Sequence, residues 1–203
     1  MGGPACNGGV YLWVGMTEND VETFLGTLLD QVAGESRRKL SGISTGLTFS
    51  KGTMLIEEGK SHDAFYIVIR GSAKSYHWKD GEAVCNWFAF ENDILATMAT
   101  MNGEASNETI ELMEDSTLIQ INSNAFAHLA ERNLDIGRLG FHWLTEHTIF
   151  LEQQVDLNSL STRARYEQIT KAYPELLQRV SMTDLASFLG MRKETLSRVR
   201  SRI

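Results

Sequence analysis

The sequence predicts an α+β protein, in which an antiparallel β-domain precedes a long helix and a small all-helical domain. Two observations carry this prediction. Between Leu47 and Ile121, short β-like runs alternate with turn signals, and beyond Asn122 the apolar residues follow a helical period. Many short strands with regular turns are typical of a β-sandwich, roll or barrel.

The β-domain is expected to begin after a short helix whose apolar positions are Val21, Phe24, Leu25, Leu28 and Leu29. Glycines that follow polar residues, at Gly59, Gly71 and Gly81, supply the left-handed conformations that turns need. The predicted strands are 53–56, 64–69, 72–78, 83–89 and 111–121.

One long helix is predicted from about Asn133 to Leu157, a stretch without proline. Seven of its residues, spaced alternately by four and three, form a heptad seam that predicts a homodimer. The seam residues are Ile136, Gly140, Trp143, His147, Phe150, Gln154 and Leu157. A second apolar line runs through Phe141, Leu144, Thr148, Leu151 and Val155. One line can pack on the β-domain while the other meets a partner; a broad core stripe within a monomer is the alternative.

Charge is divided unequally along the chain, whose net charge is −7. Residues 159–203 contain nine basic residues and four acids, a balance of +5, whereas the remainder contains ten basic residues and twenty-two acids, a balance of −12. A basic C-terminal domain is suited to phosphates, and it favours a nucleic-acid partner.

Composition limits the remaining classes. No apolar run reaches the length of a membrane span, and residues 1–16 contain no Lys or Arg, which makes them a poor secretory signal. We therefore expect a cytoplasmic protein without a membrane partner, and a flexible tail at 1–16. Two cysteines, Cys6 and Cys85, cannot complete a four-thiolate zinc or iron–sulfur site.

The C-terminus predicts a helix-turn-helix. A helix capped by Ser161 or Thr162 is expected to run to about Ala172 and to be closed by Pro174. After it, Gly190 supplies a tight turn between two short helices. The apolar faces of those helices are Leu185, Ala186 and Leu189 on the first, and Leu196, Val199 and Ile203 on the second.

The second of these helices resembles the recognition helices of the Crp/Fnr family of bacterial transcription regulators. Their pattern, Gly-x-x-x-Glu-Thr-x-Ser-Arg, is matched by Gly190, Glu194, Thr195, Ser197 and Arg198. Upstream, 51–59 and 65–74 are similar to the first hairpins of that family's cyclic-nucleotide-binding-type β-roll. The resemblance implies an antiparallel β-roll (double-stranded β-helix or jelly-roll-like) with flanking helices, and a homodimer that reads palindromic double-stranded DNA, with RNA polymerase as a candidate partner.

Carried over by position, the residues expected to read bases are Lys193, Glu194, Ser197 and Arg198. Arg pairs bidentately with guanine, and Glu accepts from the cytosine amino group. Contacts to the DNA backbone are expected from Arg163, Arg165, Arg192, Thr195, Arg200 and Arg202. Many relatives continue into a β-wing, whereas this sequence ends at Ile203, so these contacts and dimer avidity are expected to carry the affinity.

The sequence departs from the family members that bind a cyclic nucleotide, which use a Gly-Glu pair for the ribose and an Arg for the phosphate. No Lys or Arg occurs from Asp80 to Glu131, where ten acids do. A buried phosphate without a cation is costly, so we expect an unknown small-molecule effector other than cyclic AMP, and no cofactor. The candidate pocket residues are Ile94, Leu95, Thr97, Met98, Met101, Asn107 and Thr109. Haem held by His77, His142 or His147 is the alternative.

The expected domains are a tail at 1–16, a sensor β-roll at 17–132, a dimerisation helix and hinge at 133–158, and a helix-turn-helix domain at 159–203. An enzyme of the cupin kind is not expected, because His62 and His77 lack the paired His-x-His spacing of a metal site. The alternative function is a ligand- or protein-sensing module with a vestigial DNA-binding tail.

Overall fold

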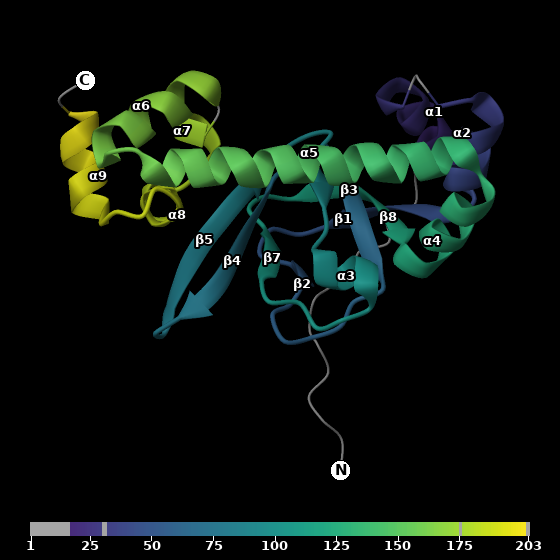
Figure 1. Cartoon of the computed structure of the whole chain (residues 1–203), viewed down its shortest axis with the longest axis horizontal. Helices are drawn as coiled ribbons and strands as arrows, with labels where there is room; N and C mark the ends of the chain where they lie inside the picture. The colour runs from purple at the N-terminus through teal and green to yellow at the C-terminus, as the bar shows by residue number, and fades with distance from the viewer. Residues whose placement is uncertain (1–16, 30–31, 175, 202–203) are drawn as a thin grey trace, which may run out of the picture. The chain divides into compact units, whose positions relative to one another are not determined.

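The computed structural model describes residues 17–29, 32–174 and 176–201 (Figure 1). By their contacts these residues form two compact units. The first comprises the described residues up to Ser75 together with Phe88–Gly140, and the second comprises Tyr76–Trp87 and the described residues from Phe141 onward. The expected tail at 1–16 lies outside the described residues. No described helix is both long and apolar enough to cross a membrane.

Two helices open the first unit. α1 (Glu18–Leu28) begins with a capping box, in which the Thr17 hydroxyl accepts from the Asp20 N–H and the Asp20 carboxylate accepts from the Thr17 N–H. The predicted apolar line of this helix is confirmed, because Val21, Leu25 and Leu29 are buried. α2 (Gly34–Ser41), which was not predicted, follows.

The strands of the described residues form two four-stranded antiparallel sheets, which confirms the predicted α+β class and the β-roll. One sheet has the order β1-β8-β3-β6 and the other β2-β7-β4-β5. The strands are β1 (Ser44–Phe49), β2 (Met54–Ile56), β3 (Ala64–Arg70), β4 (Ala73–Lys79), β5 (Glu82–Ala89), β6 (Ile94–Leu95), β7 (Thr109–Leu112) and β8 (Ser116–Asn122).

β8 lies at the centre of the first sheet. It pairs antiparallel with β1 and with β3, so that Ile119 is opposite both Gly46 and Ile67. Side chains of β3 are buried on both faces of the sheet, from Ala64 to Val68. The reason is α4 (Ser123–Arg132), whose Phe126 packs edge to face on Phe65 of β3, with ring centroids 5.4 Å apart.

The stretch predicted as a single strand at 111–121 is two strands, β7 and β8, separated by a bend at 113–115. Polar contacts hold this bend without Gly or Pro. The Ser72 hydroxyl donates to Glu114 Oε1 (2.6 Å), and the Lys51 N–H donates to Asp115 Oδ1 (2.8 Å). β1, β6 and the short helix α3 (Met98–Asn102) were also not predicted.

The predicted turn glycines Gly59, Gly71 and Gly81 all have positive φ. At Gly71 the backbone also passes so close to β8 that a Cβ would lie 2.9 Å from the Cα of Ser116. Glycine is therefore required there both for its conformation and for the missing side chain.

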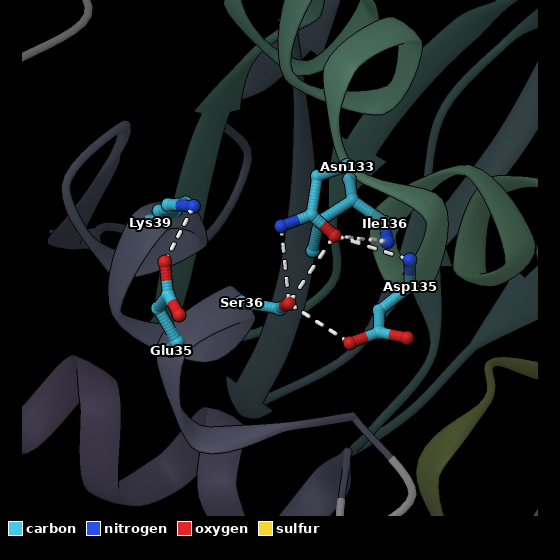
Figure 2. Close-up of polar contacts among 6 residues, drawn as sticks. All are labelled: Glu35, Ser36, Lys39, Asn133, Asp135 and Ile136. Carbon is cyan, nitrogen blue, oxygen red and sulfur yellow. Dashed lines mark hydrogen bonds and ion pairs between the residues drawn. The ribbon is translucent and has the colours of Figure 1, made fainter.

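A half-buried polar cluster fixes the start of α5 (Leu134–Ser159), as Figure 2 shows. Asn133 Oδ1 accepts the N–H groups of Asp135 (3.1 Å) and Ile136 (3.2 Å), which caps the helix. Asn133 Nδ2 donates to Ser36 Oγ of α2 (3.1 Å), and Ser36 Oγ donates to Asp135 Oδ2 (2.9 Å). The predicted long helix is confirmed. It ends at Ser159 rather than at about Leu157.

The second unit continues with α6 (Thr162–Ala172), α7 (Leu176–Arg179), α8 (Met182–Phe188) and α9 (Lys193–Arg200). The prediction for α6 is confirmed: Ser161 caps it by accepting the Ala164 N–H (3.4 Å), and it ends at Ala172, before Pro174. α7 was not predicted. The large side chains buried in these helices are Tyr166, Ile169, Leu176, Leu185, Leu189 and Leu196.

We expect Ser36→Ala to lower the free energy of unfolding by about 1–3 kcal/mol, because Asn133 and Asp135 would lose a partner in a buried site. Urea denaturation of the full chain measures this loss. Glu35→Gln is the matched control: Glu35 is exposed and pairs with Lys39 (2.8 Å), so its loss should lie within experimental error. Equal effects of the two variants would contradict the role of Ser36.

Candidate nucleic-acid interface

α8 and α9 are two short helices joined by a tight turn, the arrangement predicted for these residues. The Ser181 hydroxyl caps α8 by accepting the Asp184 N–H (3.1 Å). In the turn, Gly190 has φ +64°, a left-handed conformation that glycine adopts at no steric cost. Leu185 and Leu196 are at most 1% exposed and give each helix its buried face.

The rest of the α9 surface is exposed. All four residues predicted to read bases lie on it: Lys193, Glu194, Ser197 and Arg198. No hydrogen bond or ion pair within the described part of the chain engages their side chains. The helix therefore presents two cations, one carboxylate and one hydroxyl to solvent, a set that can donate to and accept from the edges of bases.

The residues predicted to contact the DNA backbone divide into three groups. Arg163, Arg192, Thr195 and Arg200 are exposed, and the Arg163 Nε donates to Glu167 (2.7 Å). Arg165 is half-buried and donates to three backbone carbonyls, so its guanidinium is engaged within the chain. Arg202, like Ile203, lies outside the described residues.

A hydrogen-bonded contact within the second unit joins β5 to α8. The Ser187 hydroxyl accepts from the Cys85 N–H (3.0 Å) and donates to the Ala83 carbonyl (3.3 Å). On the same hairpin, His77 Nδ1 lies 2.8 Å from Asn86 Oδ1, so a ring nitrogen that haem ligation could use is already hydrogen-bonded. A contact from a helical serine to strand backbone leaves no sequence pattern, which is why it was not predicted.

The predicted effector residues differ in exposure. Leu95, Thr97 and Thr109 are buried, Ile94 is half-buried, and Met98, Met101 and Asn107 are exposed. The buried hydroxyls are used within the fold. Thr97 Oγ1 accepts the Thr100 N–H (3.1 Å) at the start of α3, and Thr109 Oγ1 accepts the Glu58 N–H (3.1 Å).

Glu108 directly precedes β7 and contacts β4. Its carboxylate accepts a hydrogen bond from the hydroxyl of Ser75, which is fully buried. A carboxylate repels an anionic phosphate that comes close to it.

The two apolar lines of α5 differ in exposure. The predicted seam is buried or half-buried along its length, with Ile136 at 0% and Leu157 at 4%. The neighbouring line is open to solvent, with exposed fractions of 72% for Phe141 and 71% for Val155. The second line of α5 is therefore more exposed than the predicted seam, and Ile149 beside it is also 41% exposed.

An open hollow lies between α2 and the start of α5, and Ser36, Lys39, Arg132 and Asn133 are among its lining residues. Its polar groups already bond one another (Figure 2), and the hydrogen bond from Lys39 lowers the pKa of Glu35. These contacts hold α2 against the start of α5, so the hollow belongs to the packing of the two helices. The described residues also contain no group of three or more His, Cys, Asp or Glu side chains that could hold a metal ion.

Comparisons with known proteins agree with this architecture. The family model of the cyclic nucleotide-binding domain matches residues 47–133. A search of curated proteins found no match to the sequence. Among solved structures, FixK2 from Bradyrhizobium japonicum is similar with a TM-score of 0.67 at 18% identity, over 79% of this chain and 84% of that one.

Two further structures are similar. The Thermus thermophilus catabolite activator protein has a TM-score of 0.55 at 17% identity, over 86% of this chain and 85% of that one. The regulatory domain of Toxoplasma gondii PKA, solved with cAMP, has a TM-score of 0.53 at 19% identity, over 62% of this chain and 49% of that one. Residues 47–133 are therefore similar to the cyclic nucleotide-binding domain, within a chain whose fold is similar to those of FixK2 and the catabolite activator protein.

Proposed function

We propose that this chain is a homodimeric, sequence-specific DNA-binding transcription regulator, and not an enzyme, whose β-roll responds to an effector other than cyclic AMP. Residues 17–132 are the sensor, 133–158 the dimerisation helix and hinge, and 159–203 the DNA-binding domain. The observation that carries the proposal is the exposed face of α9, where Lys193, Glu194, Ser197 and Arg198 have no partner among the described residues.

Two further observations support DNA binding. The balance of +5 in residues 159–203 supplies a general attraction to phosphates. The rest of the chain is acidic and repels them, so the attraction is confined to residues 159–203. The catabolite activator protein, an activator by name, matches most of this chain in fold. Direct readout then comes from Arg198 to guanine and from Glu194 to cytosine in the major groove.

We expect in vitro selection from random duplex DNA to enrich a palindrome with the native chain. Glu194→Ala and Arg198→Ala should each relax the preference at one position of each half-site and cost about 1–3 kcal/mol per bidentate contact. Lys171→Ala, which removes a charge from an exposed position on α6, is the control and should leave the preference unchanged. An unaltered palindrome in both α9 variants would contradict the assignment. No enrichment, even in cell extract, would favour the sensing module with a vestigial DNA-binding tail.

Dimerisation is assigned to the exposed line of α5. Phe141, Leu144, Leu151 and Val155 follow spacings of three, seven and four, and all four are at least 49% exposed. Apolar residues exposed along one helix face in heptad register are the pattern that a parallel helix pair buries. Such a pair sets the two copies of α9 about one DNA turn apart, roughly 34 Å, as a palindrome requires.

We expect Leu151→Glu to convert the dimer to a monomer, because two carboxylates would face each other where the second apolar lines of the two helices meet. Sedimentation velocity measures the change. Gln153→Glu adds the same charge at an exposed position off the line and should leave the dimer intact. A dimer that survives Leu151→Glu but dissociates with Phe150→Glu would return the interface to the seam predicted from the sequence.

We expect cyclic AMP to leave the thermal unfolding of the native chain unchanged. The repulsion from Glu108 and the absence of Lys or Arg between Asp80 and Glu131 leave the phosphate without a cation. A ligand that binds the folded state adds about 2.7 kcal/mol of stability at one hundred times its Kd, so calorimetry detects binding readily. A transition temperature that rises with cyclic AMP but not with 5′-AMP would refute this part of the proposal.

A further inference from the structure

Arg165 of α6 donates to three backbone carbonyls, two of them close together in the sequence and the third much further along the chain. Its Nη1 donates to the carbonyl of Leu189 (2.7 Å). Its Nη2 donates to the carbonyls of Asn158 (3.0 Å) and Leu160 (3.3 Å). All of these residues belong to the second unit.

Each of these carbonyls lies at the C-terminal end of a helix. Asn158 is in the last turn of α5, Leu160 follows that helix directly, and Leu189 is the C-cap of α8. Carbonyls at such ends lack intrahelical partners and carry partial negative charge, so a cation that donates to them is doubly favoured. The guanidinium thus holds the end of the long helix and the end of α8 at once.

The turn before α9 is built around this guanidinium. Gly190, with φ +64°, would place a Cβ only 3.0 Å from Arg165 Nη1. The conformation and the missing side chain of Gly190 therefore both allow the guanidinium to reach Leu189. A lysine carries its three N–H donors on a single nitrogen, so it cannot occupy the separate positions of Nη1 and Nη2 that reach the two helix ends.

We propose that Arg165 is a positioning residue, a clip that fixes the turn before α9 relative to the end of α5, rather than a contact to DNA phosphate. Its effect on DNA binding rests on the function proposed above. Through this one side chain, the C-terminal end of α5 fixes the position of the turn that precedes α9.

Arg163 provides a matched comparison two residues away on the same helix. It is also an arginine, but its side chain is 67% exposed and pairs with Glu167 at the surface. Arg163→Lys and Arg165→Lys therefore make the same chemical change, the first at an exposed surface position and the second where the guanidinium donates to backbone carbonyls. A difference between the two variants reports the clip and not the charge.

The first arm of the test measures amide hydrogen exchange of the full chain without DNA. The N–H groups of Gly190 and Met191, bonded to Ser187 and Ala186, report the turn. We expect Arg165→Lys to speed their exchange about tenfold, whereas Arg163→Lys leaves it unchanged. Unchanged exchange in Arg165→Lys would overturn the clip.

A second variant keeps the inference testable if Arg165→Lys does not fold. Gly190→Ala crowds Nη1 from the other side, so it should speed the same exchange. Where both variants fold, residues that act through one contact are coupled, and the double variant should exchange within about twofold of the faster single variant. Fully additive effects would count against the clip.

The second arm measures DNA affinity against salt concentration. We expect Arg165→Lys to weaken binding to all sequences about tenfold, with the order of base preference and the salt slope unchanged. A phosphate contact would give the opposite result: Arg165→Lys would retain affinity, and Arg165→Gln would lower the slope by about one. That result would overturn the inference. If the native chain binds no DNA, the proposed function fails, while the exchange measurement still decides the clip.

Discussion

The pairing of β8 with strands on both sides is the constraint on which the first unit depends. Its register with β1 and β3 fixes where the strand ends, at Asn122. The Asn122 side chain then accepts the Ala125 N–H (2.9 Å) and starts α4, and Asn133 in turn starts α5. Two successive asparagine caps thus carry the position of the sheet into the long helix.

Charge is divided unequally between two parts of the chain. The stretch from Asp80 to Glu131 has no Lys or Arg and repels polyanions, whereas residues 159–203 carry a balance of +5. In the proposed function, Lys193 and Arg198 on the exposed face of α9 attract the DNA, and Arg198 and Glu194 select bases, because a carboxylate near the phosphate backbone is unfavourable unless it meets a base donor. Arg198 then contributes to both affinity and discrimination, whereas Glu194 contributes to discrimination alone.

Sequence predicted what depends on local chemistry. The turn glycines, the Ser161 cap, the buried face of α8 and the burial of Leu196 on α9 follow from conformation and period, and the structure confirms them. The sequence could not predict features that depend on contacts between residues far apart in the chain. The bend between β7 and β8 rests on Ser72, far away in the chain, and the exposure of the two α5 lines depends on what covers the helix.

Arg165 shows the same limit for the candidate site. Its charge and its place in a basic domain favoured a phosphate contact, and only the positions of three carbonyls reveal that the guanidinium points into the chain. Glu194 and Arg198 could be placed in advance because a helix fixes the face of each residue from its spacing alone.

β5 is the outermost strand of its sheet, and such a strand offers free N–H and C=O groups to any other strand. By occupying the N–H of Cys85 and the carbonyl of Ala83, Ser187 removes two of these groups from the reach of another strand, as a covered sheet edge requires.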